Sequence, residues 1–270
     1  MSLYDIIDEI SERSATKTET GDTRVYGVMI GVVAKNYDKD MPGRVCVSVP
    51  TRDKEKNELK WARQAQPSSG AKWGHYFLPE IGDQVLLSFE GGNIEKPYII
   101  GCIPKDNAKF LSGSVDEQNQ IKRIMTKTGN VISFEDNKEG DGAKDKINIE
   151  TAGRSHDLLL DNENKLIRLT DKAKENMLEI KTESGQMTIK AKSRLTIEVG
   201  DRIKMTFNGE SGAVKLEANE LSLQVSGQFK AKSDGMIKID GAQMSMSASS
   251  MFKAESGGMV NISGAPIKIG

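Results

Sequence analysis

Apolar residues in the last third of the chain occur in pairs whose members lie two positions apart. Successive pairs begin seven or eight residues apart, with one longer step of eleven. A spacing of two places both side chains of a pair on the same face of a β-strand. The pattern therefore predicts a series of short strands joined by tight turns. The pairs are Met187/Ile189, Leu195/Ile197, Ile203/Met205, Val214/Leu216, Leu221/Leu223, Phe229/Ala231, Ile237/Ile239, Met244/Met246, Phe252/Ala254, Val260/Ile262 and Ile267/Ile269.

These strands need a partner that covers their apolar side. The residues between the paired positions are mostly Lys, Thr, Glu, Ser and Gln, which suit a solvated outer face. Two inward side chains per strand cannot be buried by that strand alone, so stacking on other strands must bury them. A single chain coiled as a β-solenoid and three chains wrapped about one axis both meet this need. The thin interior favours three chains, in which each open strand edge pairs with a neighbouring chain.

The predicted needle covers residues 121–270. Less regular apolar pairs between residues 131 and 180 lengthen it toward the N-terminus. The polar stretch before it, residues 106–120, is rich in Ser, Asn and Asp and indicates a linker. The side chains expected to form the core of the trimer are Ile189, Ile197, Ile203, Leu216, Leu223, Ile239 and Ile262.

Residues 24–105 show alternating apolar positions in runs separated by glycine and proline turns. About five short strands within this length are typical of a small Greek-key barrel such as the OB-fold. The alternating sets are Tyr26/Val28/Ile30/Val32, Val45/Val47/Val49, Trp61/Ala65, Val85/Leu87/Phe89 and Tyr98/Ile100/Cys102.

The first residues of the chain predict a short amphipathic helix. Leu3, Ile6, Ile7 and Ile10 follow the i, i+3, i+4, i+7 spacing, and a polar connector completes residues 1–23. A helix this short is marginal alone, so its apolar stripe needs a partner. That partner is either its own domain or another protein.

Composition excludes several classes of protein. The chain has 270 residues, with 38 basic and 39 acidic side chains, so it has no bulk basic surface for nucleic acid or anionic lipid. No apolar run approaches the roughly 20 residues of a membrane-spanning helix. The acidic N-terminus does not resemble a secretory signal peptide, and two cysteines give no disulfide framework, which fits assembly in a reducing cytoplasm.

The sequence offers no catalytic, metal or cofactor site. Its two histidines, His75 and His156, lie in different domains without a paired cysteine or carboxylate motif. A nucleophile needs a base within hydrogen-bond reach, and nothing in the spacing suggests one. The acidic residues between 135 and 150 surround glycines, and we expect a solvated loop there.

Several motifs in the N-terminal half resemble the OB domain of contractile-tail spike proteins. The family includes the valine-glycine repeat (VgrG) spikes of type VI secretion and the baseplate spikes of contractile phages. The resemblance implies an all-β homotrimer with an OB collar and an intertwined triple-stranded β-helix needle. The motifs are Gly43-Arg44-Val45, WARQAQP at 61–67, Trp73-Gly74, FLPEIGDQVLLSFEGG at 77–92 and TKTGNVISFED at 126–136.

The resemblance also implies partners. Full-length type VI spikes carry a hub-like region before the OB domain, which this sequence lacks, so a separate hub protein is expected to bind Leu3, Ile6, Ile7 and Ile10. A conical proline-alanine-alanine-arginine (PAAR) tip protein is expected to sit on the needle, with effectors as further candidates. Its expected interface is Ala265, Pro266, Ile267, Ile269 and Gly270.

The function expected from these features is structural. The protein would assemble in the bacterial cytoplasm into a phage-tail-like particle, and contraction would drive it outward through a target envelope, with transient membrane contact. One alternative is an adhesive or carbohydrate-binding β-solenoid, which would place aromatics along the needle, where the sequence has no Trp or Tyr. Another is an OB-fold nucleic-acid binder, which would require a basic cluster beside the barrel aromatics.

Overall fold

The computed structural model describes residue 17 and residues 24–49, 58–106 and 108–268. The predicted N-terminal helix, with Leu3, Ile6, Ile7 and Ile10, lies outside the described residues, as do Ile269 and Gly270. The chain divides into two compact units, residues 1–197 with 206–215, and residues 198–205 with 216–270.

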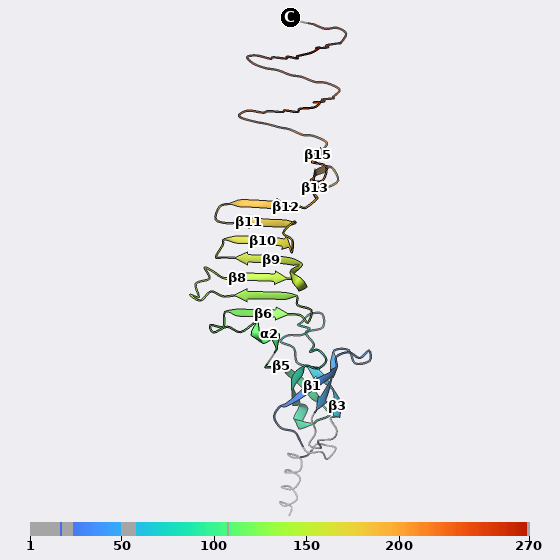
Figure 1. Cartoon of the computed structure of the whole chain (residues 1–270). Helices are drawn as coiled ribbons and strands as arrows, with labels where there is room; N and C mark the ends of the chain where they lie inside the picture. Colours follow the sequence, from blue (N-terminus) through green and yellow to red (C-terminus); the bar gives the residue numbers. More distant parts are fainter. Residues whose placement is uncertain (1–16, 18–23, 50–57, 107, 269–270) are drawn as a thin grey trace, which may run out of the picture. The chain divides into compact units, whose positions relative to one another are not determined.

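The N-terminal strands close into a small barrel. Its strands follow the order β1-β2-β3-β5-β4 around the barrel. Figure 1 shows the barrel in blue to green, with β1, β3 and β5 labelled. β3 and β5 run parallel, and the other neighbouring strands run antiparallel. This five-stranded closed barrel confirms the OB-fold prediction. The strands are β1 (Met29–Lys35), β2 (Arg44–Val49), β3 (Glu58–Gln64), β4 (Gln84–Phe89) and β5 (Pro97–Ile103), with a short 3-10 turn, η1 (Glu90–Gly92), between β4 and β5.

The barrel interior is aliphatic and tightly closed. The alternation predicted for β2 and β4 is confirmed, because both sets of alternating residues face the interior. Most of these side chains are completely shielded from water. The buried cluster is Val33, Val45, Val47, Val49, Ala62, Val85, Leu87, Phe89 and Ile99.

Strand β1 faces the opposite way from the prediction. Val28, Ile30 and Val32 are exposed, whereas Val33 is buried. The reason lies at Gly31, where an added Cβ would stand 2.7 Å from Leu87 Cδ1 and 3.2 Å from the Ser48 carbonyl oxygen. Only a residue without a side chain fits this inward position, so the apolar residues on either side of it point outward.

The predicted inward side of strand β5 is also wrong. A β-bulge between Leu86 and Leu87 shifts its register against β4, which pairs Leu87 with Ile99. Ile99 is therefore buried, and Ile100 and Cys102 are exposed. Tyr98 and Ile100 of the predicted alternating set lie on the outer side of the barrel, whereas Cys102 pairs with the buried Val85.

After the barrel, a short helix, α2 (Lys109–Ser112), lies within the predicted linker, and a seven-stranded antiparallel meander follows. Each strand pairs with the next along the chain, so successive turns lie at opposite ends of the strands. The strands are β6 (Ile121–Met125), β7 (Val131–Glu135), β8 (Lys146–Glu150), β9 (His156–Asp161), β10 (Leu166–Asp171), β11 (Met177–Lys181) and β12 (Gln186–Lys190), with a 3-10 turn, η2 (Ala152–Arg154), between β8 and β9.

Aspartates fix the turns of the meander. Asp161 accepts hydrogen bonds from the backbone and side chain of Asn164, and Asp171 accepts them from Glu175 and Asn176. Burial by itself would raise the pKa of Asp161, but these bonds bring that pKa below its ordinary value. For Asp171 the side-chain bond from Asn176 is the main cause of a lowered pKa. These carboxylates therefore stabilise the turns in their charged form.

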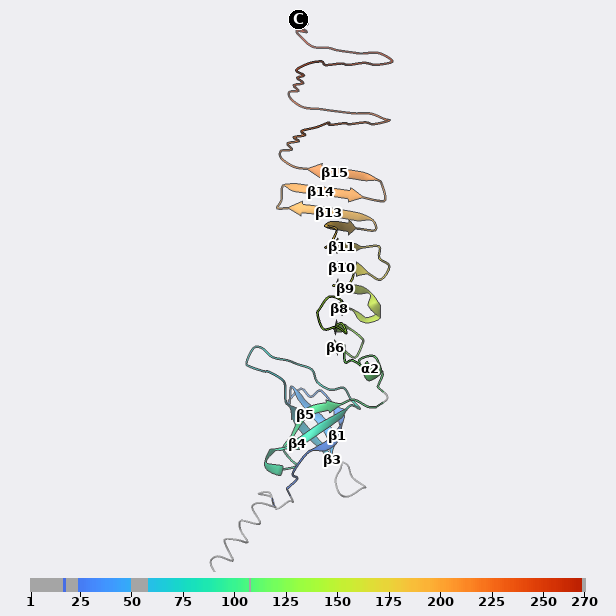
Figure 2. The ribbon, with the colours of Figure 1, turned by 90° about the vertical axis from the view of Figure 1, so that its left-hand side faces the viewer.

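The next three strands form a smaller sheet, in the order β13 (Arg194–Val199), β14 (Ile203–Asn208) and β15 (Ala213–Glu217). Strands β12 to β15 therefore pair with strands of their own chain. The pairing of the remaining open strand edges with other chains stays a prediction. Residues 218–268 form neither strand nor helix, and all of them are exposed. Their trace turns back and forth in wide loops (Figures 1 and 2).

Candidate assembly surface

One face of the β6–β12 meander is a continuous apolar surface. Cross-strand pairing aligns its side chains in two columns that run across the sheet. We call this surface the apolar face. The first column is Phe134, Ile147, Leu160, Ile167, Ile180 and Met187, and the second is Ile124, Ile132, Ile149, Leu158, Leu169, Leu178 and Ile189.

Nothing in the described chain covers the apolar face. Leu169, in its middle, is 50 % exposed, and Ile189, at its β12 end, is 56 % exposed. The corresponding inward residues of the barrel, such as Val45 and Leu87, are 0 % exposed. Contiguous apolar surface on this scale marks an interaction site in a soluble protein.

The opposite face of the same sheet, which we call the polar face, is mainly charged or polar, with six apolar side chains among them: Ile121, Met125, Val131, Leu159, Leu166 and Met177. Arg168 lies 3.7 Å from Asp157 across neighbouring strands, and the Asn148 side chain donates to Glu150. The side chains of these residues also include buried polar atoms without a protein partner, namely Asn148 Oδ1, Asp157 Oδ1 and Arg168 Nε. The sheet therefore has one continuous apolar face and one mainly polar face.

The structure does not bring the predicted trimer-core residues together within one chain. Ile189 lies in the apolar face, Ile197, Ile203 and Leu216 lie on β13, β14 and β15, and all four are exposed. Leu223, Ile239 and Ile262 lie in the extended segment 218–268 and are also exposed. Their meeting across chains stays a prediction.

The expected tip interface is described only in part. Ala265, Pro266 and Ile267 are exposed. Ile269, Gly270 and the whole set expected to bind the hub lie outside the described residues. These assignments likewise stay predictions.

The outer surface of the barrel carries a second apolar group that sequence reasoning missed. Ile30 of β1 pairs with Leu86 of β4, which in turn pairs with Gly101 beside the exposed Ile100. Val28 and Val32 extend this group along β1. Gly31 is the residue of the sequence that could have indicated this group. A glycine between Ile30 and Val32 fits an inward position, which turns Met29 and Val33 inward and Ile30 and Val32 outward.

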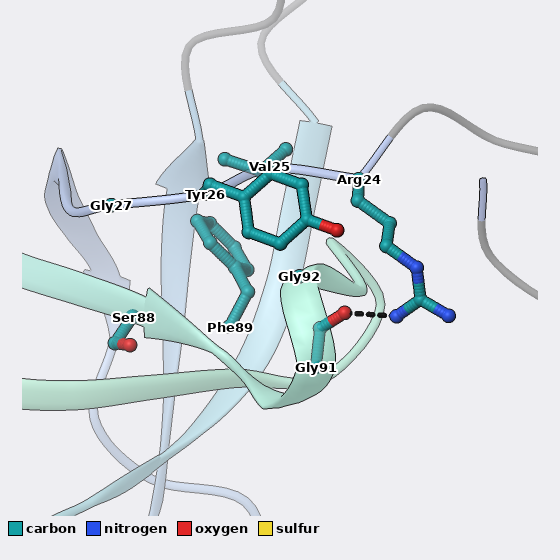
Figure 3. Close-up of a pocket in the computed structure, with 8 residues that line it drawn as sticks. All are labelled: Arg24, Val25, Tyr26, Gly27, Ser88, Phe89, Gly91 and Gly92. Carbon is teal, nitrogen blue, oxygen red and sulfur yellow. Dashed lines mark hydrogen bonds between the residues drawn. The ribbon is translucent and has the colours of Figure 1, made fainter. Parts of the chain in front are cut away.

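A hollow beside the barrel holds no catalytic arrangement. Residues 24–27 line it against Ser88, Phe89 and η1, and its volume is about 510 Å³ (Figure 3). The Arg24 guanidinium donates to the Gly91 carbonyl, and the Val25 backbone donates to Gly92 at 2.9 Å. The hollow is lined by a single ionisable cation and lacks a base beside Ser88. These contacts fasten the segment that leads into β1.

The two histidines are exposed and lie apart, His75 in a loop of the barrel domain and His156 at the start of β9. His75 Nδ1 lies 3.0 Å from Ser68 Oγ, and His156 Nδ1 lies 3.3 Å from Thr151 Oγ1. Neither pair is joined by a carboxylate among the hydrogen bonds of the described residues. Over residues 24–49, 58–106 and 108–268, no group of three or more His, Cys, Asp or Glu side chains is placed to hold a metal ion. None of the helices in that part of the chain is long and apolar enough to cross a membrane.

Comparison with known proteins places the barrel in a family. The type VI secretion system/phage-baseplate injector OB domain matches residues 29–103, the span from the start of β1 to the end of β5. The barrel of this chain is thus similar to that OB domain, and the match does not extend to the meander that follows. The closed five-stranded barrel agrees with this similarity.

Curated relatives of this chain are type VI secretion system spike proteins of Pseudomonas aeruginosa. VgrG2a is 33 % identical over 76 residues, which cover 27 % of this chain and 9 % of VgrG2a. VgrG1a is 26 % identical over 141 residues, which cover 50 % of this chain and 22 % of VgrG1a. The matched segments thus span less than a quarter of these relatives. All are named as spike proteins.

Proposed function

We propose that this chain is the central spike of a contractile injection machine, a homotrimer with an OB collar and a triple-stranded β-helix needle. The observation that carries the proposal is the uncovered apolar face of β6–β12. Three copies that turn this face toward a common axis would cover one another and leave their polar faces in water. The similarity of the barrel to the type VI secretion system/phage-baseplate injector OB domain supports the same arrangement.

Residues 218–268 support the needle. Their apolar pairs keep the spacing of short strands, yet this segment has no strand partner among the described residues of its own chain. Extended backbone with unpaired N–H and C=O groups needs partners when it becomes buried. In an intertwined needle, strands of the other two chains supply these partners.

The mass in solution tests the trimer. Light scattering on the full chain at micromolar concentration should give three times 29.6 kDa. Chemical cross-linking should trap dimers and trimers and nothing larger. A chain that stays monomeric at these concentrations would overturn the proposal.

The role of the spike is mechanical. Its parts assemble in the bacterial cytoplasm into a phage-tail-like particle, and contraction delivers the needle outward through the target envelope, with brief membrane contact. A needle of three interlocked chains resists unfolding under force, because freeing one chain breaks strand edges with two others. This function needs no cofactor.

The tip-protein interface would comprise Ala265, Pro266, Ile267, Ile269 and Gly270. Pro266 cannot donate to a strand ladder, so it suits a strand start or an exposed edge. Co-expression with a PAAR-type protein should capture that protein on the wild-type chain and lose it on the Ile267→Asp/Ile269→Asp variant. Lys268→Glu is the matched control, because Lys268 lies between the two apolar positions. Equal capture by an intact trimer of the double variant would refute this interface.

The hub interface would comprise Leu3, Ile6, Ile7 and Ile10. Deletion of residues 1–13 should leave a folded trimer that binds its hub protein more weakly. If the truncated chain fails to fold, the segment belongs to its own domain.

A further inference from the structure

The turns of the β6–β12 meander form two rows, one at each end of its strands, and the two rows differ in charge. One row, which we call the acidic edge, consists of turns 136–145, 162–165 and 182–185 and carries six carboxylates against three lysines. The other row, the basic edge, consists of turns 126–130, 151–155, 172–176 and 191–193 and carries five cationic side chains against one carboxylate. Because the meander is antiparallel throughout, this sorting follows directly from its topology.

Ion pairs within the chain reduce this difference without cancelling it. On the basic edge Lys127 pairs with Glu80, Arg154 with Glu150 and Lys192 with Glu175. On the acidic edge Asp136 pairs with Lys122 and Glu163 with Lys146. In the part of the chain that the structure describes, Glu183, Lys172 and Lys174 have no ion-pair partner, and all three are exposed. Their charges are available to another molecule.

We infer that the acidic edge of one copy docks against the basic edge of the next copy; this rests on the proposed homotrimer. Around an axis parallel to the stacking direction of the strands, each sheet presents opposite edges to its two neighbours. Contacts of this head-to-tail kind close into a ring when the rotation permits. The charge difference favours copies that point the same way along the axis. If one copy were inverted, two acidic edges or two basic edges would meet and repel each other.

In a symmetric trimer, corresponding strands of the three copies lie at the same height along the axis, and this determines which turns meet. Neighbouring strands lie about 4.8 Å apart, so turn 182–185 of one copy stands about one strand spacing from turns 172–176 and 191–193 of the next. Glu183 then faces Lys174 and Lys192. By the same reasoning, Glu163 faces the turn that holds Lys172 and Lys174 and the turn that holds Arg154. Such edge charges chiefly set orientation and register, and the apolar faces supply affinity.

Charge reversal in the full chain tests this inference. One variant reverses the basic edge with Lys172→Glu, Lys174→Glu and Lys192→Glu, and a second reverses the acidic edge with Glu139→Lys, Glu163→Lys and Glu183→Lys. Each should raise the apparent dissociation constant of the trimer at least about tenfold at low salt, because like charges then meet at all three contacts. The chain that carries all six substitutions is the matched control. It should return to within about threefold of the wild type, because its edges are complementary again.

The outcomes separate this inference from the proposed function. A trimeric wild type whose single-edge variants assemble equally well would overturn the edge contact and leave the spike proposal intact. Loss of assembly that the six-substitution chain does not restore would also overturn it, because damage to the sheet explains that result. A monomeric wild type would overturn both. Circular dichroism on each variant checks that the meander is folded.

Discussion

Replacing Ile189 by aspartate tests whether another copy covers the apolar face. Ile189 is 56 % exposed in the single chain, where its cross-strand neighbour is Leu178. Full burial of an isoleucine is worth about 1.5–3 kcal/mol, so covering the exposed half contributes roughly 1–1.5 kcal/mol per chain. Three such losses in a trimer amount to roughly 3–4.5 kcal/mol. At about 1.4 kcal/mol for each factor of ten, they correspond to at least a hundredfold weaker assembly.

The buried carboxylate increases the effect and makes it depend on pH. Three unpaired carboxylates near one axis are desolvated and repel one another, which raises the pKa of the introduced group in the trimer above its value in the monomer. Protonation therefore favours the trimer. The Ile189→Asp trimer should be weakest at neutral pH and should recover as the pH falls through the raised pKa.

Gln186→Asp is the control for this substitution. Gln186 lies on the same strand but on the polar face, opposite Lys181, so a carboxylate there stays in water. Light scattering over a concentration series should give a trimer for the control and dissociation for Ile189→Asp. Equal assembly by the two variants would refute the claim that other copies cover the apolar face.

Three further predictions concern stability. Lys165 has a φ of 50°, which costs about 1–2 kcal/mol for a residue with a side chain, so Lys165→Gly should raise the melting temperature by a few degrees and Lys165→Ala should not. The pKa of Asp171 is lowered in the folded chain, so its contribution is complete above the ordinary value of 3.8 and is lost as the pH falls through the lowered pKa. Melting temperatures should be level above about pH 5 and fall in acid, less steeply for Asp171→Asn, and a flat profile down to pH 2 would contradict this. Gly31→Ala should destabilise the barrel by about 1–3 kcal/mol in urea unfolding, because its Cβ would stand against both Leu87 and a backbone oxygen, and Leu87→Val should recover part of the loss.

The alternation of apolar residues was enough to predict the barrel, but it left the phase of single strands open. In β2, Val45, Val47 and Val49 alternate with polar or small residues, so their inward side is unambiguous. Around β1, apolar residues occupy both phases, and the choice depends on the contact between Gly31 and Leu87. That contact joins two strands distant in sequence, so a local pattern could not decide it.

The meander shows a second limit of the same kind. A strand that pairs within its chain and a strand that pairs with another chain have the same alternation, because both bury one face. The sequence therefore predicted which side chains of β8 to β11 share a face, such as Ile147 with Ile149. It did not predict that these strands pair with one another in a single chain.

The edge charges depend on topology in a way that the apolar columns do not. Along the sequence, the seven turns together carry seven carboxylates and eight cationic side chains, so their charges nearly cancel. Once the antiparallel order assigns successive turns to opposite edges, Glu163 and Glu183 fall on one side, and Lys174 and Lys192 fall on the other. The apolar face demands only some cover, which two, three or more copies could provide. The opposite charges of the edges add an orientation, because each copy must present its acidic edge to the basic edge of the next.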